Sequence, residues 1–176
     1  MNKLLILDKD KTLVIPRSGG KWVESPKDQE LMPGVADTLY LYAAAGWTLA
    51  IASNQGGVAS GKKTLGSCID EMFFAMRLTG IELAMAAHSY ENEYGEAIFL
   101  DLTDGGIFWE PISNRNARFR KPSGGMIDYL ASRIFDGGIP ETLFVGDRAE
   151  DQGAAEAAGV RFMWAHDWVN GPGDIG

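Results

Sequence analysis

Residues 4–13 read LLILDKDKTL. The unbroken apolar run from Leu4 to Leu7 is typical of a β-strand that is buried on both faces of a parallel sheet. The run ends in two carboxylates, Asp8 and Asp10, and a hydroxyl follows at Thr12. Two acids this close repel each other unless a cation lies between them or one of them stays protonated. Taken alone, the pattern fits a metal site and a solvated turn equally well.

The composition favours one soluble domain over residues 1–176. A chain of 176 residues, 45% of them hydrophobic, is long enough for one core and short for two. The formal net charge of −8 repels polyanions and argues against a general nucleic-acid binder, although a local basic patch would override it. The single cysteine, Cys68, excludes an intramolecular disulfide and fits a reducing compartment. The first apolar run is too short for a signal peptide or membrane anchor, so a cytoplasmic protein is expected.

Strands and helices are expected to alternate along the chain. Apolar runs predict further strands at residues 47–52, 81–87, 142–145 and 160–165. Helical spacing of apolar residues predicts helices at 33–46, about 64–79, 123–137 and before Gly159. The first of these helices would bury Val35, Leu39, Tyr42 and Ala43. This alternation predicts a Rossmann-like three-layer α/β/α sandwich with a mainly parallel central sheet.

Two excursions interrupt the alternation, at about residues 14–30 and 89–120. The first is rich in Pro, Ser, Gly and charge, which predicts a small hairpin with its turn at Gly19-Gly20. In the second, residues 97–102 and 107–109 flank the turn sequence TDGG, which predicts another hairpin. That hairpin is either a lid over a site or an extension of the core sheet. A polar tail is expected after residue 165.

Polar side chains follow three of the predicted strands. In a parallel sheet, ligands bind beyond the carboxyl ends of the strands, where Asp8, Ser53 and Asp147 would lie. Lys121 precedes a helix that can bring it to the same edge. Singly, each has an ordinary explanation: Ser53 as a turn residue, Lys121 as a solvated charge, and Asp147 with Asp151 as the acidic start of a helix. Those explanations do not account for the expected meeting of all these side chains at one edge of the sheet.

The chain resembles the haloacid dehalogenase superfamily, whose four motifs occur here in order. They are Asp8-Lys9-Asp10-Lys11-Thr12, Ser53-Asn54, Lys121-Pro122, and Gly146-Asp147 with Asp151. The resemblance extends from Leu4 to about Trp168 and implies a phosphatase fold with a small cap or none. Four motifs in the right order are far more specific than any one of them.

The resemblance implies a magnesium-dependent phosphomonoester hydrolase that forms an aspartyl-phosphate. Asp8 would be the nucleophile, and Asp10 the general acid and base. Mg²⁺ would be held by Asp8, the backbone carbonyl of Asp10, and Asp147. The carboxylate of Asp10 also argues for an enzyme that turns over, because relatives that keep their phosphoenzyme lack an acid at this position.

The remaining motif residues are implied to bind phosphate or to support the site. Ser53, Asn54 and Lys121 would bind the phosphate oxygens and stabilise charge in a loose transition state. Thr12 would be supporting, and Asp151 would hold a metal-bound water or orient Lys121. The family usually has glycine at the position of Lys11, so this turn either uses ordinary dihedral angles or is somewhat strained.

Four stretches, TLV at 12–14, PRSG at 16–19, SNQGG at 53–57 and RKPSGGM at 120–126, look most like the small-capped subgroup, similar to subfamily IIIA. It includes polynucleotide 3'-phosphatases, histidinol-phosphate phosphatases and heptose-bisphosphate phosphatases. The last two usually carry a cysteine and histidine zinc loop before the lysine motif, which is lacking here, so no zinc site is expected. Its absence favours the 3'-phosphate ends of polynucleotides as substrate. The segment from Gly146 to Asp151 instead looks closer to small-metabolite phosphatases, which keeps a sugar phosphate or histidinol phosphate as an alternative.

Two further features bear on the substrate. A basic cluster would favour a nucleic-acid strand end, although ordinary solvated charge explains it as well. Its members are Arg115, Arg118, Arg120 and Lys121, to which Arg17, Lys21, Lys62 and Lys63 could add. Trp22 and Trp109 would either stack on a base or pack the excursions. A third alternative is a catalytically weak module that binds a phosphorylated ligand or partner.

Overall fold

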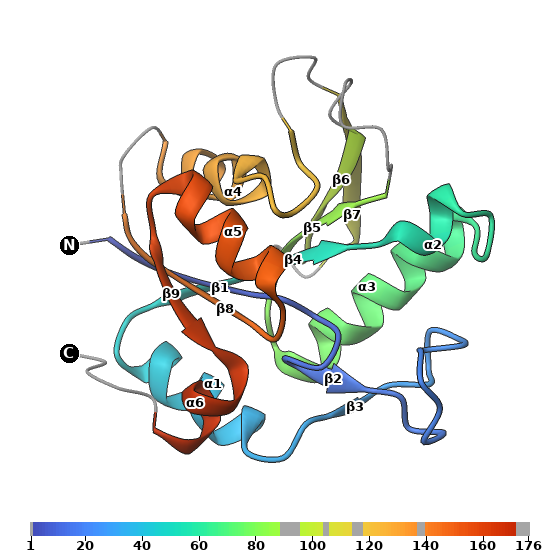
Figure 1. Ribbon diagram of the computed structural model, residues 1–176, viewed down its shortest axis with the longest axis horizontal. Helices are drawn as coiled ribbons and strands as arrows, with labels where there is room; N and C mark the ends of the chain where they lie inside the picture. The colour runs from blue at the N-terminus through green and yellow to red at the C-terminus, as the bar shows by residue number, and fades with distance from the viewer. Residues whose placement is uncertain (1, 89–95, 104–105, 114–117, 137–139, 172–176) are drawn as a thin grey trace.

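The computed structural model describes residues 2–88, 96–103, 106–113, 118–136 and 140–171. Within these ranges seven strands form one sheet: β1 (Lys3–Leu7), β4 (Thr48–Asn54), β5 (Leu83–Ala87), β6 (Glu96–Asp101), β7 (Phe108–Ser113), β8 (Glu141–Gly146) and β9 (Arg161–Trp164). Their spatial order is β7-β6-β5-β4-β1-β8-β9 (Figure 1). The five strands from β5 to β9 in this order pair parallel, whereas β6 pairs antiparallel with both β5 and β7. The prediction of a mainly parallel central sheet is confirmed.

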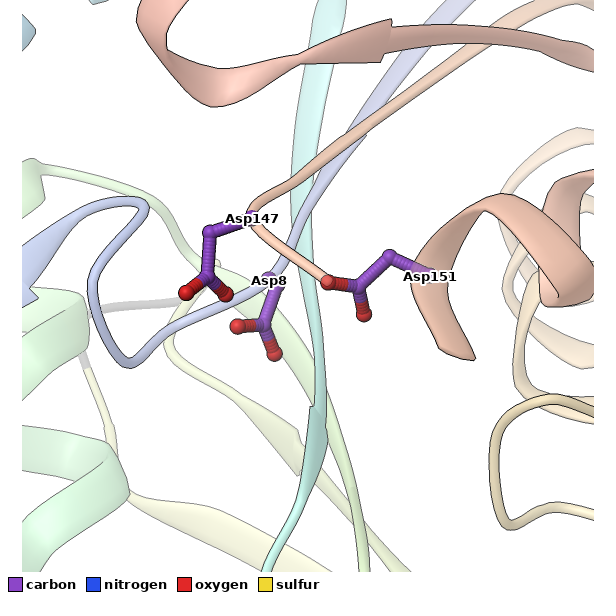
Figure 2. Close-up of side chains that lie close together, drawn as sticks. All are labelled: Asp8, Asp147 and Asp151. Atoms are coloured by element: carbon purple, nitrogen blue, oxygen red, sulfur yellow. The ribbon is translucent and has the colours of Figure 1, made fainter. Parts of the chain in front are cut away.

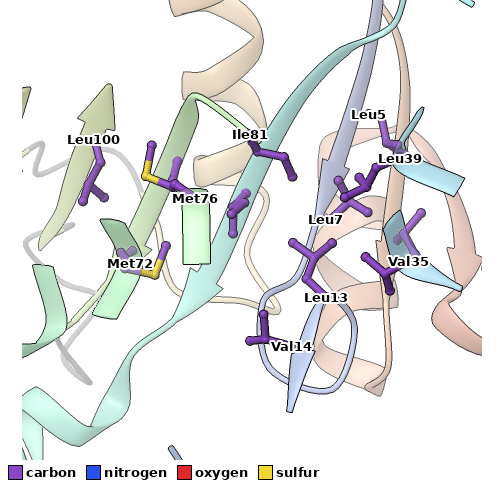
Figure 3. Packing of buried hydrophobic residues seen from close by; sticks show 14 of the residues in the cluster. Leu5, Leu7, Leu13, Val14, Val35, Leu39, Met72, Met76, Ile81 and Leu100 are labelled. Carbon is purple, nitrogen blue, oxygen red and sulfur yellow. The ribbon is translucent and has the colours of Figure 1, made fainter. Parts of the chain in front are cut away.

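Helices cover both faces of the sheet (Figure 1). The covering helices are α1 (Val35–Ala44), α3 (Leu65–Thr79), α4 (Gly125–Phe135), α5 (Ala149–Ala158) and α6 (Ala165–Asn170). A short helix, α2 (Gly56–Ala59), follows β4 and buries none of its residues. Side chains alternate across β1, so Leu5 and Leu7 pack with α1, α3 and α6, as Figure 3 shows in part. Leu4 and Ile6 point the other way and pack with α4 and α5. None of the four has exposed surface, so β1 is buried on both faces as predicted.

The helix ends follow from local chemistry. Thr64 accepts a hydrogen bond from Ser67 N at 3.0 Å and begins α3, and Gly80 ends it with a φ of 72°. Helix α1 buries Val35, Thr38, Leu39 and Tyr42. The prediction that Ala43 lies on this face is wrong, because it is one residue beyond the stripe and is exposed.

The first excursion is a loop closed by a short β-ladder. Strands β2 (Val14–Ile15) and β3 (Glu30–Leu31) pair antiparallel, so the predicted hairpin turn at Gly19-Gly20 is wrong. Asp28 holds the loop together, because its carboxylate accepts hydrogen bonds from Ser18 N at 2.7 Å, Ser18 Oγ at 3.0 Å and Glu24 N at 3.2 Å. The loop is therefore held by hydrogen bonds to the carboxylate of Asp28 and not by a tight turn at Gly19-Gly20.

The second excursion contributes β6 and β7, which extend the sheet. Strand β6 pairs with β5 from Leu83 opposite Asp101 to Ala87 opposite Ala97, and β7 pairs with β6. Of the two interpretations of this hairpin, the structure therefore has the sheet extension. Residues 104–105 of its predicted turn lie outside the described residues.

The chain after residue 165 is not a polar tail. It forms α6, whose Trp168 is fully buried with its ring centroid 6.1 Å from that of Tyr42. No helix in the part of the chain that the structure describes combines the length and hydropathy needed to cross a bilayer.

Candidate active site

The predicted site residues meet at the carboxyl edge of β4, β1 and β8. Asp8 follows β1 directly, and Asp147 follows β8 directly. The backbone N–H of Asp8 donates to Val145 O at 2.9 Å, which continues the pairing of the two strands and brings the two acids side by side. Ser53 and Asn54 were expected in a turn, but they form the last two residues of β4. The strand continues into polar residues because its pairing with β5 continues there.

Three carboxylates converge at this edge (Figure 2). Asp8, Asp147 and Asp151 each offer an oxygen, and these oxygens lie within 4.8 Å of one another. Asp147 Oδ1 is buried and accepts no hydrogen bond, and its ion-pair partner, Arg148 Nε, is 3.9 Å away. Carboxylate oxygens are the ligands that Mg²⁺ prefers, and a bound cation would satisfy the buried oxygen. The cluster can therefore bind a metal ion.

Lys121 lies against two of these acids. Its Nζ is 2.6 Å from Asp8 Oδ1 and 2.6 Å from Asp151 Oδ1, and it donates to Ala52 O at 2.9 Å. Burial lowers the pKa of Lys121, but Asp8 and Asp151 outweigh this effect and raise that pKa above its ordinary value. The ammonium is therefore charged at neutral pH.

Asn54 lines the cavity, and its side chain also holds the main chain of Lys121. Its Oδ1 accepts from Lys121 N at 3.0 Å, and its Nδ2 donates to Lys121 O at 3.0 Å. Phosphate binding by Asn54 stays a prediction, because Nδ2 has a second proton and neither bond to Lys121 has to break for a phosphate to contact it. Ser53 is buried beside it, and its Oγ accepts from Gln55 Nε2 at 2.9 Å.

An additional positive charge beside Asp8 would stabilise its ionised form. Burial raises the pKa of Asp8 to about 7, Lys121 opposes this rise, and Asp151 and Asp10 add to it. One ammonium thus faces several carboxylates in a buried site. A divalent cation beside Asp8 would favour its ionised form, which is the form that can act as a nucleophile.

Lys11 adopts the left-handed conformation, with a φ of 64°. Its N–H donates to Val14 O at 2.8 Å, and Leu13 N donates to Lys9 O at 3.0 Å. The sequence left open whether this turn uses ordinary dihedral angles or is strained. The positive φ shows that it is strained, because residues with a Cβ rarely adopt this conformation.

The sequence motifs did not assign roles to three side chains that surround Asp10. Lys9 Nζ lies 2.7 Å from Asp10 Oδ1, and Gln55 Nε2 lies 3.3 Å from Asp10 Oδ2. Lys9 Nζ also lies 2.7 Å from Glu71 Oε1, and the side chain of Lys9 has no exposed surface. A signal was present in the sequence, because Glu71 interrupts the apolar stripe of α3 that includes Ile69 and Met72.

A cavity of about 530 Å³ opens above the acids. Asp8, Asp10 and Lys121 line it together with rim residues that include Trp22, Lys62, Lys63, Arg120 and Arg148. Trp22 is 54% exposed, and Lys11 Nζ, Lys21 Nζ and Arg148 Cζ lie 5.8, 5.4 and 5.8 Å from its ring centroid. The cavity therefore has a basic and aromatic rim.

Part of the predicted basic cluster contributes to this rim. Arg120, Lys62 and Lys63 line the cavity, whereas Arg118 is exposed and is not part of the lining. Arg115 lies outside the described residues. Trp109 lies on β7 and is also not part of the lining.

Comparison with known proteins places these features in a family. Residues 3–166 match the model of the polynucleotide kinase 3 phosphatase family. The chain is 31% identical over 160 residues to D-glycero-beta-D-manno-heptose-1,7-bisphosphate 7-phosphatase of Pseudomonas putida, covering 90% of this chain and 79% of that protein. The enzyme of the same name from Neisseria meningitidis serogroup A is 32% identical over 158 residues, covering 89% and 73%.

A solved structure has the same fold. The D,D-heptose 1.7-bisphosphate phosphatase of B. bronchiseptica, crystallised with magnesium and phosphate, superposes with a TM-score of 0.65 at 22% identity, covering 99% of this chain and 88% of that one. The family model spans all four motifs, from Asp8 to Asp151. The chain therefore belongs to the polynucleotide kinase 3 phosphatase family, within the haloacid dehalogenase superfamily of phosphatases.

Proposed function

We propose that the protein is a magnesium-dependent phosphatase that hydrolyses a small phosphorylated metabolite, of the sugar-phosphate type, through an aspartyl-phosphate on Asp8. The observation that carries the proposal is the contact of the Asp8 carboxylate with Lys121 at 2.6 Å, at the floor of a cavity of about 530 Å³ that Asp10 also lines. A cavity of this size suits a small ligand. The heptose-bisphosphate phosphatases among the relatives support the same substrate class.

The chemistry follows from three side chains. A carboxylate oxygen of Asp8 attacks phosphorus, and the bond from phosphorus to the ester oxygen breaks. Asp10 gives its proton to that leaving oxygen and later takes a proton from the water that attacks the aspartyl-phosphate, which returns Asp8 and releases phosphate. Lys121 balances negative charge on the phosphoryl group throughout.

The acids divide into metal ligands and a positioning residue. Asp8, Asp147 and the backbone carbonyl of Asp10 would hold Mg²⁺, and the bound ion would supply the charge that lets a phosphate approach Asp8. Both oxygens of Asp151 already have partners: Oδ1 contacts Lys121 Nζ at 2.6 Å, and Oδ2 accepts from Arg148 N at 3.0 Å. Asp151 is therefore assigned to orienting Lys121 rather than to the metal. Ser53 and Thr12 are buried and do not line the cavity, so they are assigned supporting places beneath it, whereas Asn54 and Lys121 line it.

The 3'-phosphate end of a polynucleotide is the second candidate substrate. The description of the matching family model favours it. The rim of the cavity also favours it, because Arg120, Arg148 and Lys62 can contact a strand and the half-exposed ring of Trp22 can stack on a base. The net charge of −8 opposes it.

Phosphate release by the purified protein tests the proposal. With Mg²⁺, wild type is expected to hydrolyse p-nitrophenyl phosphate, and Asp8→Asn is expected to reduce release to the level of buffer. Asp70→Asn is a matched control, because Asp70 is exposed on α3 and loses the same charge. Inactive wild-type protein would instead favour a module that binds a phosphorylated ligand.

A substrate panel then separates the two classes. Heptose bisphosphate, histidinol phosphate and a 3'-phosphorylated oligonucleotide would be compared by kcat/KM at one stated salt concentration. Faster turnover of a small metabolite is expected. Preferential turnover of the oligonucleotide would replace the sugar-phosphate assignment with the polynucleotide one.

A further inference from the structure

Five polar side chains form a closed ring at one side of the active site, and all of them except Lys9 line the cavity. The ring runs from Asp10 through Lys9, Glu71, Lys63 and Gln55 back to Asp10. Lys9 Nζ is 2.7 Å from Asp10 Oδ1 and 2.7 Å from Glu71 Oε1, and Lys63 Nζ pairs with Glu71 Oε2. Lys63 Nζ donates to Gln55 Oε1 at 3.4 Å, and Gln55 Nε2 donates to Asp10 Oδ2 at 3.3 Å. Both oxygens of each carboxylate therefore have a partner within this polar ring.

The inner half of the polar ring is buried. Lys9 has no exposed surface, and Glu71 is 2% exposed. Gln29 adds two contacts, because its Oε1 lies 3.4 Å from Lys9 Nζ and its Nε2 donates to the backbone O of Glu71 at 3.1 Å. Removing two charges from water is costly, and an apolar replacement of such a pair is often as stable. A contribution to folding stability therefore explains the polar ring poorly. Holding its side chains in a fixed geometry explains it better.

The two contacts of Asp10 are unequal. Lys9 donates to Oδ1 at 2.7 Å, a length typical of a charge-assisted hydrogen bond, and an ammonium cannot accept a proton in return. Gln55 donates to Oδ2 at 3.3 Å, which is long for a hydrogen bond. The geometry leaves Oδ2 as the oxygen that can carry a proton, and Asp10 also lines the cavity.

We propose that Glu71 is a positioning residue for proton transfer by Asp10, a role that rests on the proposed function. Glu71 holds Lys9 against Asp10 Oδ1, and through Lys63 it holds Gln55 near Oδ2. Without its charge, Lys9 and Lys63 would lose their common partner and the carboxylate of Asp10 would lose its fixed orientation. Proton transfer depends on such orientation, because donor and acceptor must meet at hydrogen-bond distance.

The test compares two esters that differ in their need for an acid. p-Nitrophenolate leaves without a proton, whereas the alkoxide of a hexose phosphate does not. For Glu71→Gln, kcat/KM is expected to fall about 10- to 100-fold for the alkyl ester, and less than about threefold for p-nitrophenyl phosphate, since a general acid contributes about 10²- to 10⁴-fold. Loss of substrate binding alone would lower both values together and leave their ratio unchanged.

Three variants make the interpretation specific. Asp70→Asn removes an acid from the exposed side of the same helix and is expected to leave the ratio at the wild-type value. Asp10→Asn shows the full dependence on the acid, and adding Glu71→Gln to it is expected to cause no further change in the ratio. Glu71→Asp keeps the charge and serves if Glu71→Gln does not fold, as judged by circular dichroism; an intermediate ratio is expected.

The outcomes separate this inference from the proposed function. If wild type and Asp10→Asn behave as described but Glu71→Gln and Glu71→Asp keep the wild-type ratio, the positioning role is overturned and the phosphatase assignment stands. If wild type hydrolyses neither ester, the proposed function is overturned, and the positioning role with it.

Discussion

Lys11 illustrates how much one residue can reveal about the loop that carries the acids. Its φ of 64° lies in the left-handed region, where an L-residue costs roughly 1–2 kcal/mol relative to glycine. The loop keeps this conformation because Lys11 N, Leu13 N and Val14 N all donate to backbone carbonyls within it. The side chain of Lys11 in turn reaches the ring of Trp22 at the rim of the cavity.

A pair of substitutions isolates this backbone effect. Lys11→Gly and Lys11→Ala both remove the contact with Trp22, but only alanine keeps a Cβ at a positive φ. The glycine variant is expected to be more stable by about 1 kcal/mol, although glycine usually loses more entropy on folding. Urea unfolding of the two variants measures the difference in free energy. An alanine variant as stable as the glycine variant would contradict the left-handed conformation.

At the scale of elements, the connection from β8 to α5 depends on Gly146. A Cβ at this position would lie 2.4 Å from both Cβ and Cγ of Asp151. Asp151 has no room to retreat, because it is 1% exposed and is tied to Lys121 and to Arg148 N. Strand and helix therefore approach closely enough to present Asp147 and Asp151 together.

Gly146→Ala is expected to disturb both stability and activity. Overpacking of this kind costs about 1–3 kcal/mol, and displacement of Asp151 would release Lys121 from its place beside Asp8. We expect at least a tenfold loss of phosphatase kcat/KM. Gly106→Ala is the control, because a Cβ there meets nothing within 4 Å. Equal behaviour of the two variants would show that the helix can shift without harm.

Elements with a strong apolar period could be predicted from the sequence. Leu4 to Leu7 predicted a strand buried on both faces, and the stripe through Ile69 and Met72 predicted α3, because burial itself imposes those periods. Helix α6 could not be predicted in this way. Its Trp168 is buried against Tyr42 of α1, a contact between segments far apart in the chain.

In the candidate site, too, local patterns predicted some features, and others depend on contacts between separate segments. Asp8 and Asp147 directly follow buried strands and Ser53 lies at the end of another, so the parallel strand order brings these three to one edge. Lys121 reaches the same edge from the segment before α4. The partners of Glu71 come from two other segments, and no local pattern specifies such a pairing. Motifs therefore predicted which groups meet, and the folded chain adds what holds them in place.

At the scale of the whole molecule, negative charge dominates. The chain has 24 acidic and 16 basic residues, and it gathers three carboxylates at the edge of the sheet. Repulsion within that cluster makes the folded state less stable than it would be with a cation bound. Folding and metal binding are therefore expected to be coupled.

Thermal unfolding with and without Mg²⁺ measures this coupling. At 100 times its dissociation constant, Mg²⁺ is expected to add about 2.7 kcal/mol to the free energy of unfolding, which corresponds to roughly 5–11 °C in Tm. Asp147→Asn is expected to lose most of that shift, and EDTA to reverse it in wild type. A shift of the same size in Asp147→Asn would place the ion elsewhere.

The position of β1 also has a consequence for protein synthesis. This strand lies between β4 and β8, and β8 leaves the ribosome long after β1 does. Until then one edge of an apolar strand has no partner, and such edges are prone to aggregation. Asp147 is made immediately after β8, so a nascent chain lacks its metal site until the same moment. Phosphatase activity would therefore report that a newly made chain has paired its first strand with its penultimate one.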